Sequence, residues 1–222
     1  MTAVAQARVD AIGCDGATVR WLGRRAYEPC WRAMQAFTDA RNRNTQDEIW
    51  LTEHEPVYTL GLAGRLSHVH ATGVIPVIRV DRGGQVTYHG PGQLVAYLLF
   101  DLRRNRSGVR AMVRTVEQAV IDFLAPLGVR AYGKIDAPGV YVERDGTEAK
   151  LAALGLKVRN GCTYHGLALN VAMDLAPFRA IDPCGYAGLA VTSLERLGVV
   201  LDVRSAGMRL APMLAHRLSV KR

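Results

Sequence analysis

The chain has 222 residues, of which 49% are hydrophobic and 22% charged, proportions that are ordinary for a soluble globular protein. This length predicts one large domain, or one domain with a small appendage, and it allows a sizeable core without disulfide or metal staples. The net charge is +8, so the composition is compatible with an acidic partner: nucleic acid, an anionic membrane surface or an acidic protein.

The cysteines argue against both a zinc site and a disulfide framework. They are Cys14, Cys30, Cys162 and Cys184. Their spacing is wide and contains no CxxC pair. Residues 1–13 lack the continuous apolar segment of a secretory signal, and the longest uncharged stretch, residues 83–100, is interrupted by glycines, a proline and a histidine. We therefore expect a cytoplasmic protein with reduced thiols and no membrane partner.

The first half of the chain predicts several strands and two helices, after a loosely ordered segment at 1–15. Runs rich in β-branched and aromatic residues predict strands at 18–22, 48–52, 57–60, 74–80 and 94–100. Apolar residues spaced by three and four predict a helix over 26–43, with Pro29 in its first turn. The same spacing predicts a longer helix over 109–127, which Gly128 ends.

The second half predicts a three-stranded meander followed by short helices. Strands at 139–143, 148–158 and 163–171 are separated by an Asp-Gly pair and an Asn-Gly pair. Asp174 can cap a helical turn near Phe178; further helices are expected from 191–197 and over 205–218, with 219–222 loosely ordered. Hairpins outnumber βαβ units, so we expect one α+β domain over residues 1–222, with a mixed, largely antiparallel sheet flanked by helices.

One glycine-rich segment, residues 82–93, carries many polar groups and leads directly into the buried strand at 94–100. It is expected to be a loop rather than a helix or a regular strand. Residues without a Cβ permit close approach of the backbone to another group. The polar residues of the segment include Arg82, Gln85, Thr87, Tyr88, His89 and Gln93. From composition alone, a purely structural turn is the favoured explanation of the segment, because glycine-rich turns are common.

Among the groups that could perform chemistry, Cys184 and Lys150 are the most unusual. Cys184 lies between Pro183 and Gly185, in a turn that can present a thiol to a cleft. Lys150 opens the apolar run 151–156, where partial desolvation would suit a general base. Each also has an ordinary explanation, as a small buried apolar residue and as a lysine that extends to water. His68 and His70 alternate in a polar loop, where a surface position is favoured over a metal site.

The segment 82–97 resembles the signature of the bacterial octanoyltransferases of lipoate biosynthesis, the LipB family. Further segments are similar to the family's other motifs and occur in the same order along the chain: residues 53–61, 138–142, 150–158, 163–171, 183–186 and 191–194. Several ordered blocks are far more specific than one short motif. The resemblance implies the fold of the lipoate and biotin protein ligase catalytic domains.

The resemblance also implies a cysteine–lysine dyad, with Cys184 as the nucleophile and Lys150 as the general acid and base. The thiolate would take an octanoyl group from octanoyl-acyl carrier protein as a thioester, and a lysine of a lipoyl domain would then accept it. The implied acceptors are the lipoyl domains of 2-oxoacid dehydrogenase E2 subunits and the glycine cleavage H protein. No cofactor, metal or nucleic acid is implied, and a monomer is expected.

The family's acyl-binding positions carry over onto three segments of small and polar residues. They are Arg82, Gly83, Gly84, Gln85, Val86, Thr87, Tyr88, His89, Ala153, Leu154, Gly155, Gly166, Leu167 and Ala168, with His165 beside them. A group of arginines after the central strand is either a solvated face or a docking surface for an acidic carrier or lipoyl domain. These are Arg103, Arg104, Arg106, Arg110 and Arg114.

Two other functions remain open at this point. An ATP-dependent lipoate–protein ligase of the same superfamily would form an adenylate and need no nucleophilic cysteine. A basic nucleic-acid-binding module would interleave aromatic residues with Arg and Lys on one surface, which 7% aromatic residues, largely at apolar positions, make a weak case.

Overall fold

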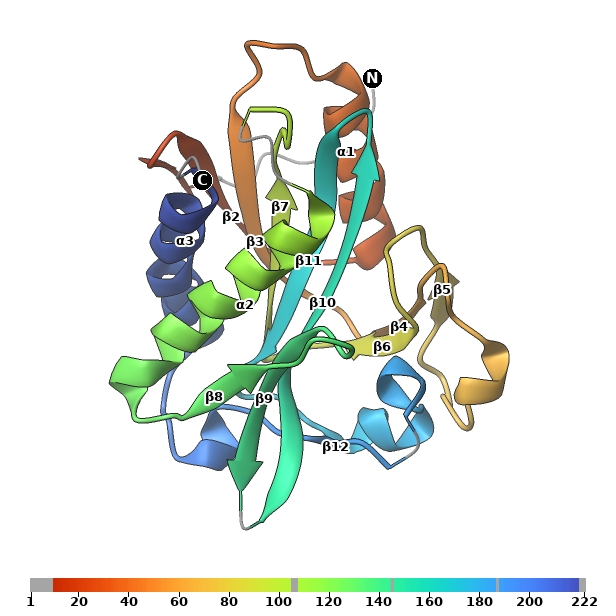
Figure 1. Cartoon of the computed structure of the whole chain (residues 1–222). Helices are drawn as coiled ribbons and strands as arrows, with labels where there is room; N and C mark the ends of the chain where they lie inside the picture. Colours follow the sequence, from red (N-terminus) through yellow and green to blue (C-terminus); the bar gives the residue numbers. More distant parts are fainter. Residues whose placement is uncertain (1–9, 105–107, 145, 187, 220–222) are drawn as a thin grey trace.

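A computed structural model describes residues 10–104, 108–144, 146–186 and 188–219, and for Cys184 it describes the backbone alone (Figure 1). The framework is a twisted nine-stranded sheet. Its strands follow in the order β1 (Asp10–Cys14), β2 (Ala17–Arg25), β3 (Asp47–His54), β7 (Gln93–Leu99), β11 (Cys162–Asn170), β10 (Thr147–Arg159), β9 (Gly139–Arg144) and β8 (Ala131–Gly133). The short strand β12 (Ala190–Val191) pairs with β10 off this path.

Most neighbouring strands run antiparallel, which confirms the predicted fold class. Parallel pairing occurs between β2 and β3 and between β10 and β12. The predicted meander over residues 139–171 is present as β9, β10 and β11. The register between β10 and β9 shifts between Lys150 and Ala152, so the strand is irregular where it carries Lys150.

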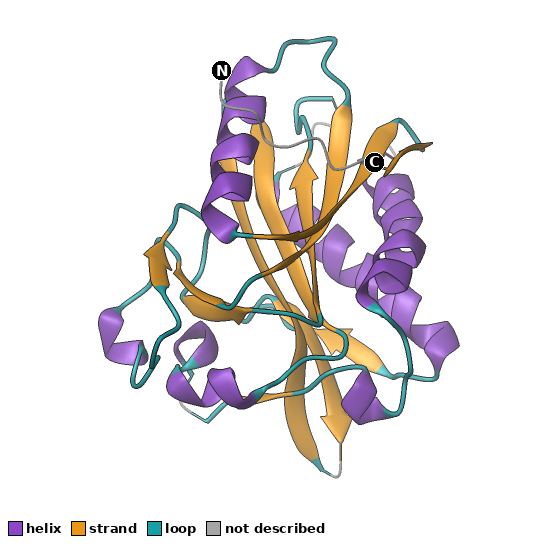
Figure 2. Ribbon diagram, turned by 180° about the vertical axis from the view of Figure 1, so that it is seen from behind, coloured by secondary structure: helices purple, strands orange, loops and turns teal. Residues whose placement is uncertain are grey.

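Helices cover both faces of the large sheet (Figure 2). On β7, Leu94, Ala96 and Leu98 pack in the core beneath α2 (Val109–Leu124) and α3 (Val203–Ser219). Val95 and Tyr97 alternate with them and pack with Met34 of α1 (Tyr27–Ala40) on the other face. Both faces of β7 are covered, and this explains why its sequence is apolar at consecutive positions.

A second, three-stranded sheet lies beside the large one, in the order β5 (Val77–Arg79), β4 (Val57–Leu60) and β6 (Val86–His89). The glycine-rich segment 82–93 was expected to be a loop throughout, and this is wrong for its middle, residues 86–89, which form β6, and for Gln93, which begins β7. Tyr58 and Tyr88 are cross-strand partners whose ring centroids lie 5.3 Å apart. Burial of these side chains against Phe178 favours a strand despite the surrounding glycines.

Several short elements were missed or placed differently. Residues 10–14 form β1 on the edge of the sheet, where loose order was expected, and residues 1–9 lie outside the described chain. Ser219 belongs to α3, whereas residues 220–222 are not described. The helix expected from 191–197 is instead β12 followed by a single 3-10 turn, η5 (Glu195–Leu197). The remaining 3-10 turns are η1 (Leu66–His68), η2 (Ala125–Leu127), η3 (Ala176–Ala180) and η4 (Pro183–Gly185).

Candidate active site

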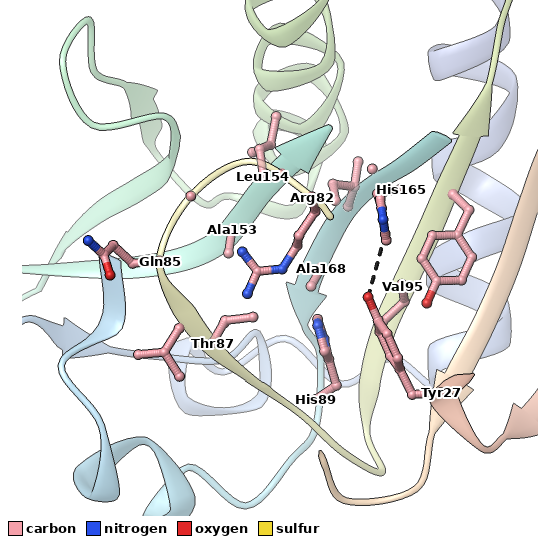
Figure 3. Close-up of a pocket in the computed structure, with 16 residues that line it drawn as sticks. Tyr27, Arg82, Gln85, Thr87, His89, Val95, Ala153, Leu154, His165 and Ala168 are labelled. Carbon is pink, nitrogen blue, oxygen red and sulfur yellow. Dashed lines mark hydrogen bonds between the residues drawn. The ribbon is translucent and has the colours of Figure 1, made fainter. Parts of the chain in front are cut away.

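A narrow cavity of about 60 Å³ lies between the small sheet and strands β7, β10 and β11 of the large sheet (Figure 3). All the residues expected to bind the acyl chain line it, except Gly83 and Tyr88. The lining consists of Tyr27, Arg82, Gly84, Gln85, Val86, Thr87, His89, Val95, Tyr97, Ala153, Leu154, Gly155, His165, Gly166, Leu167 and Ala168. Segments about 70 residues apart in sequence therefore meet at one cavity.

Small residues at paired positions leave room for the cavity. Gly155 pairs with Gly166, and Ala153 pairs with Ala168, across β10 and β11. A Cβ at Gly166 would approach the Ala96 carbonyl oxygen to 2.0 Å, so only glycine fits there. A Cβ at Gly155 would come within 2.9 Å of the Gly83 carbonyl oxygen. Gly155 thus lets the glycine-rich segment lie directly on β10, whereas Gly166 allows the close approach of the β7 backbone at Ala96.

Gly83 and Tyr88 lie outside the cavity. The Gly83 N–H donates to the Leu156 carbonyl at 3.0 Å, which ties the segment to β10. The Tyr88 side chain points to the opposite side of β6 and packs edge-on against Phe178, with 5.6 Å between ring centroids. The alternation of a strand accounts for this, because Thr87 and His89 face the cavity when Tyr88 faces away.

A chain of directed hydrogen bonds fixes the polar groups on the β6 side of the cavity. The guanidinium of the buried Arg82 donates to the Thr59 carbonyl at 2.6 Å and to the Thr59 hydroxyl at 2.9 Å. The Thr59 hydroxyl lies 3.3 Å from His89 Nε2, and His89 Nδ1 lies 2.7 Å from the Gln93 side-chain oxygen. The Gln93 oxygen can only accept, so Nδ1 carries the proton and Nε2 accepts from Thr59.

Burial keeps two imidazoles of this region neutral. It lowers the pKa of His89 to about 3, assisted by the nearby His54. It also lowers the pKa of His54 to about 4. His54 Nδ1 donates to the Arg25 carbonyl at 2.9 Å, so Nε2 accepts from the Tyr97 hydroxyl at 2.5 Å. Both rings are therefore single, fixed tautomers at neutral pH.

Asp81 orients the opposite wall. Its carboxylate accepts hydrogen bonds from His165 Nε2 at 2.9 Å and from Trp31 Nε1 at 2.8 Å, and from the Tyr164 hydroxyl. Burial alone would raise the pKa of Asp81, but these three donors hold it well below its ordinary value. His165 has a left-handed backbone, with φ at 59°, and its Nδ1 faces the Tyr27 hydroxyl at 3.5 Å.

Sequence reasoning missed several residues of this site. Tyr27, Thr59, Asp81 and Tyr97 all line the cavity or hold a group that does. Asp81 directly precedes the glycine-rich segment, so its position was the one available signal. The other three look like ordinary core residues of a helix and two strands, and only the fold shows what they contact.

Lys150 is buried at the irregular point of β10, with 4% of its surface exposed. Its ammonium donates to the Pro138 carbonyl at 3.0 Å and lies 5.1 Å from the centroid of the Tyr141 ring. The rival lysines differ. Lys134 pairs with Glu148 at 2.5 Å and its side chain is 40% exposed, and Lys157 is only partly buried. The structure therefore singles out Lys150 as the desolvated lysine of the region.

The segment that carries Cys184 lies against both the cavity wall and the strand of Lys150. A Cβ at Gly185, the next residue, would lie 3.5 Å from Gln85 Cγ. Val191, seven residues after Cys184, pairs with Lys150 itself. Upstream, the Asp182 carboxylate accepts from His68 at 3.1 Å and from His70 at 3.0 Å; His70 is exposed, as expected, whereas His68 is half-buried.

Tyr186 connects the surroundings of the cavity and of Lys150. It lines a hollow of about 310 Å³ together with Gln85 and Leu154 of the cavity wall and with Pro138, the hydrogen-bond partner of Lys150. It also lines a wider hollow of about 740 Å³, with Lys134, Tyr141 and Glu148. Two hollows thus adjoin Tyr186, two residues after Cys184.

The arginine group is largely paired with carboxylates of the same chain. Arg103 binds Asp101 at 2.7 Å, Arg104 binds Asp47 at 3.1 Å and Arg114 binds Glu117 at 2.9 Å. Arg110 is exposed, and Arg106 lies outside the described residues. Internal pairing reduces the positive field that these side chains present to a partner.

The described part of the chain has neither a membrane-spanning helix nor a cluster of metal-binding side chains. Within residues 10–104, 108–144, 146–186 and 188–219, no helix is both long and apolar enough to cross a membrane. In the same ranges, no group of three or more His, Cys, Asp and Glu is arranged to hold a metal ion.

Comparison with known proteins agrees with this architecture. Residues 26–211 match the family described as the lipoyl protein ligase A/B catalytic domain. The chain is 57% identical to an octanoyltransferase of Chromobacterium violaceum over 92% of its own length and 97% of that protein. It is similar in fold to a bipartite lipoate protein ligase of Thermoplasma acidophilum, with a TM-score of 0.72 and 16% identity over 90% of this chain and 82% of that one. The biotin protein ligase of Aquifex aeolicus shares the fold more distantly, with a TM-score of 0.53 and 11% identity over 90% of this chain and 68% of that one. The chain is therefore a member of the octanoyltransferase family, within the lipoyl protein ligase A/B catalytic domain family.

Proposed function

We propose that the protein transfers an octanoyl group from octanoyl-acyl carrier protein to a lysine of lipoyl domains, through a thioester on Cys184. The observation that carries this proposal is one arrangement: a narrow cavity walled by small residues, with a buried lysine and a cysteine-bearing turn beside it. The names of its relatives give the acyl group, and the lipoylation systems among its structural neighbours suggest the acceptor.

In the first step, the Cys184 thiolate attacks the thioester carbonyl of the donor. A bond forms between Sγ and the carbonyl carbon, and the carbon–sulfur bond to the carrier breaks. The thiolate forms when the neutral Lys150 amine takes the proton of the Cys184 thiol, and the resulting ammonium passes this proton to the carrier thiolate as that thiolate leaves. A neighbouring cation favours the thiolate form of a cysteine, and a positioned acid and base contributes about 10² to 10⁴ in rate.

In the second step, the ε-amine of the acceptor lysine attacks the octanoyl thioester. Lys150 takes the proton that the amine loses as the amide forms, and returns it to the departing Cys184 sulfur. The enzyme is regenerated, and the conversion of a thioester into an amide supplies the driving force. We propose that no nucleotide and no cofactor take part.

The cavity is proposed to hold the acyl chain. Burial of an alkyl chain contributes about 0.8 kcal/mol per CH₂, so an octanoyl tail contributes several kcal/mol of binding. The neutral state of His89 and His54 suits this role, because a hydrocarbon chain gives a charged imidazole no partner. We further propose that the protein acts as a cytoplasmic monomer on E2 lipoyl domains and the glycine cleavage H protein.

Intact-mass measurement after incubation with octanoyl-acyl carrier protein tests the proposal. An octanoyl mass increment is expected on the peptide that contains Cys184, and the Cys184→Ala variant should lack it. Cys162→Ala is the matched control, since Cys162 is buried in β11 near Arg103. Octanoyl transfer that continues in Cys184→Ala would contradict the mechanism. A requirement for ATP would favour the ligase alternative.

A further inference from the structure

A single peptide group lies between a buried carboxylate and the Lys150 ammonium. The Gly139 N–H donates to Glu117 Oε1 at 2.8 Å. The carbonyl of the same peptide, that of Pro138, accepts from Lys150 Nζ at 3.0 Å. The negative group thus lies at the N–H end of the peptide dipole and the positive group at its C=O end. Each hydrogen bond polarises the peptide in the direction that strengthens the other.

Both ends of this arrangement, Glu117 and Gly139, are tightly packed. Glu117 is 2% exposed and lies on the face of α2 that packs on the sheet. Gly139 has φ at 150°, and a Cβ there would lie 2.4 Å from Lys150 Cε and 2.9 Å from Nζ. A buried carboxylate is costly unless it is paired and hydrogen-bonded, and Glu117 meets this condition through Arg114 and the Gly139 N–H on a helix face that is otherwise apolar except for Thr115.

The other charged groups near Glu117 and Lys150 are paired with groups of opposite charge or with carbonyl oxygens. Arg114 donates to Glu117 Oε2 at 2.9 Å and to the Lys134 carbonyl at 2.8 Å. The Lys134 ammonium lies 4.9 Å from the centroid of the Tyr141 ring, which Lys150 also contacts, and its charge is met by Glu148 at 2.5 Å. Glu117 is therefore the carboxylate linked to Lys150 through one peptide, whereas Glu148 acts on Lys134.

We propose that Glu117 is a positioning residue for Lys150, and that it acts through the Pro138–Gly139 peptide. The carboxylate fixes the peptide plane, the peptide carbonyl fixes the amine, and the negative charge favours the ammonium form of Lys150. This inference rests on the proposed role of Lys150 in acyl transfer. It makes the helix α2 part of the catalytic machinery, although no residue of α2 lines the acyl cavity.

The Glu117→Gln variant tests the proposal, because its side-chain oxygen can still accept from Gly139 while the charge is lost. We expect kcat to fall about tenfold with little change in KM, and the limb of the pH–rate profile that reports Lys150 to move to lower pH. Glu48→Gln is the matched control. Glu48 is also a buried carboxylate bound to an arginine, Arg20, but it lies on β3 away from Lys150.

A second variant keeps the test informative if Glu117→Gln folds poorly. Arg114→Gln removes the cation that partly neutralises Glu117, and the Arg114 side chain is 41% exposed, so the fold should tolerate the change. The pH limb should then move in the opposite direction, to higher pH. A profile that is unchanged in both variants, or that moves equally in Glu48→Gln, would overturn the proposal. Loss of transfer in Lys150→Ala, measured alongside, separates this outcome from a failure of the proposed function itself.

Discussion

The cavity and the surroundings of Lys150 share strand β10, yet their titratable side chains are held in different ways. Around the cavity, the imidazoles of His54 and His89 are neutral and locked into single tautomers by hydrogen bonds. Around Lys150, the groups are charged and paired: Glu117 with Arg114, and Lys134 with Glu148. Under the proposed function this difference would correspond to a division of roles, in which one region holds the acyl chain and the other transfers protons.

The largest effect is expected from removing the amine. Lys150→Ala should lower octanoyl transfer by about 10² to 10⁴, because a positioned acid and base is lost. Lys134→Ala, which removes the other ammonium on the Tyr141 ring, should lower it by less than about tenfold. Steady-state transfer to a lipoyl domain measures both. Comparable losses of transfer in the two variants would contradict the assignment of Lys150, and not Lys134, as the acid and base.

Filling the cavity should change which acyl chain is used. Ala168 is buried and pairs with Ala153 across the cavity floor, so Ala168→Leu should lower kcat/KM for octanoyl donors about 10- to 100-fold and spare butanoyl donors. Overpacking should cost about 1 to 3 kcal/mol of stability, which thermal unfolding reports. Ala172→Leu, at an exposed position after β11, is the control. An equal loss for both donors would show that the chain binds elsewhere.

The neutral imidazoles predict acid sensitivity. The pKa of His54 is about 4 in the folded protein, and the unfolded chain has its ordinary value near 6.5. Between these values the unfolded chain binds the proton and the folded protein does not, so the free energy of unfolding falls as the pH drops from about 6.5 to about 4. The loss is roughly 3 kcal/mol for this one group.

His54→Gln should flatten that pH dependence, as denaturant unfolding at several pH values would reveal. His216→Gln, at an exposed position on α3, provides the comparison. If the slope between pH 6.5 and 4 is the same in all three proteins, His54 is not the neutral buried group described here.

The smallest effect is expected at Asp182, which ties the cysteine-bearing segment to His68 and His70. These pairs are near the surface, where water screens ion pairs so that they contribute little to stability. Asp182→Asn should therefore leave thermal stability nearly unchanged and reduce transfer a few-fold by loosening the turn. A loss as large as that of Lys150→Ala would mean that Asp182 has a direct chemical role.

The sequence predicted the sheet class and the cavity better than it predicted the supporting groups. Long periodic segments such as α2 and the meander were found because their own residues determine them. Ordered motifs identified most of the cavity wall. Strand β6 was misjudged because the glycines on either side of it outweighed the buried Tyr88, and the burial of that residue depends on Phe178 from a distant segment.

The hydrogen-bond partners of the site residues could not be predicted from the sequence, for a related reason. Asp81 meets His165, Thr59 meets Arg82, and Glu117 reaches Lys150 through Gly139. Each of these contacts joins segments far apart in the chain, and none has a local spacing pattern. Short-range patterns show which residue types are available, whereas only tertiary packing decides which of them touch.

The central claim is that an octanoyl thioester forms on Cys184. The most direct test is whether the isolated octanoyl-enzyme transfers its acyl group to a lipoyl domain. The octanoyl-enzyme is isolated by gel filtration, mixed with a lipoyl domain in the absence of ATP, and followed by intact mass. We predict that the octanoyl increment leaves the enzyme and appears on the domain at least as fast as steady-state turnover. An octanoyl-enzyme that fails to react while turnover proceeds, or that transfers only when ATP is added, would contradict the account.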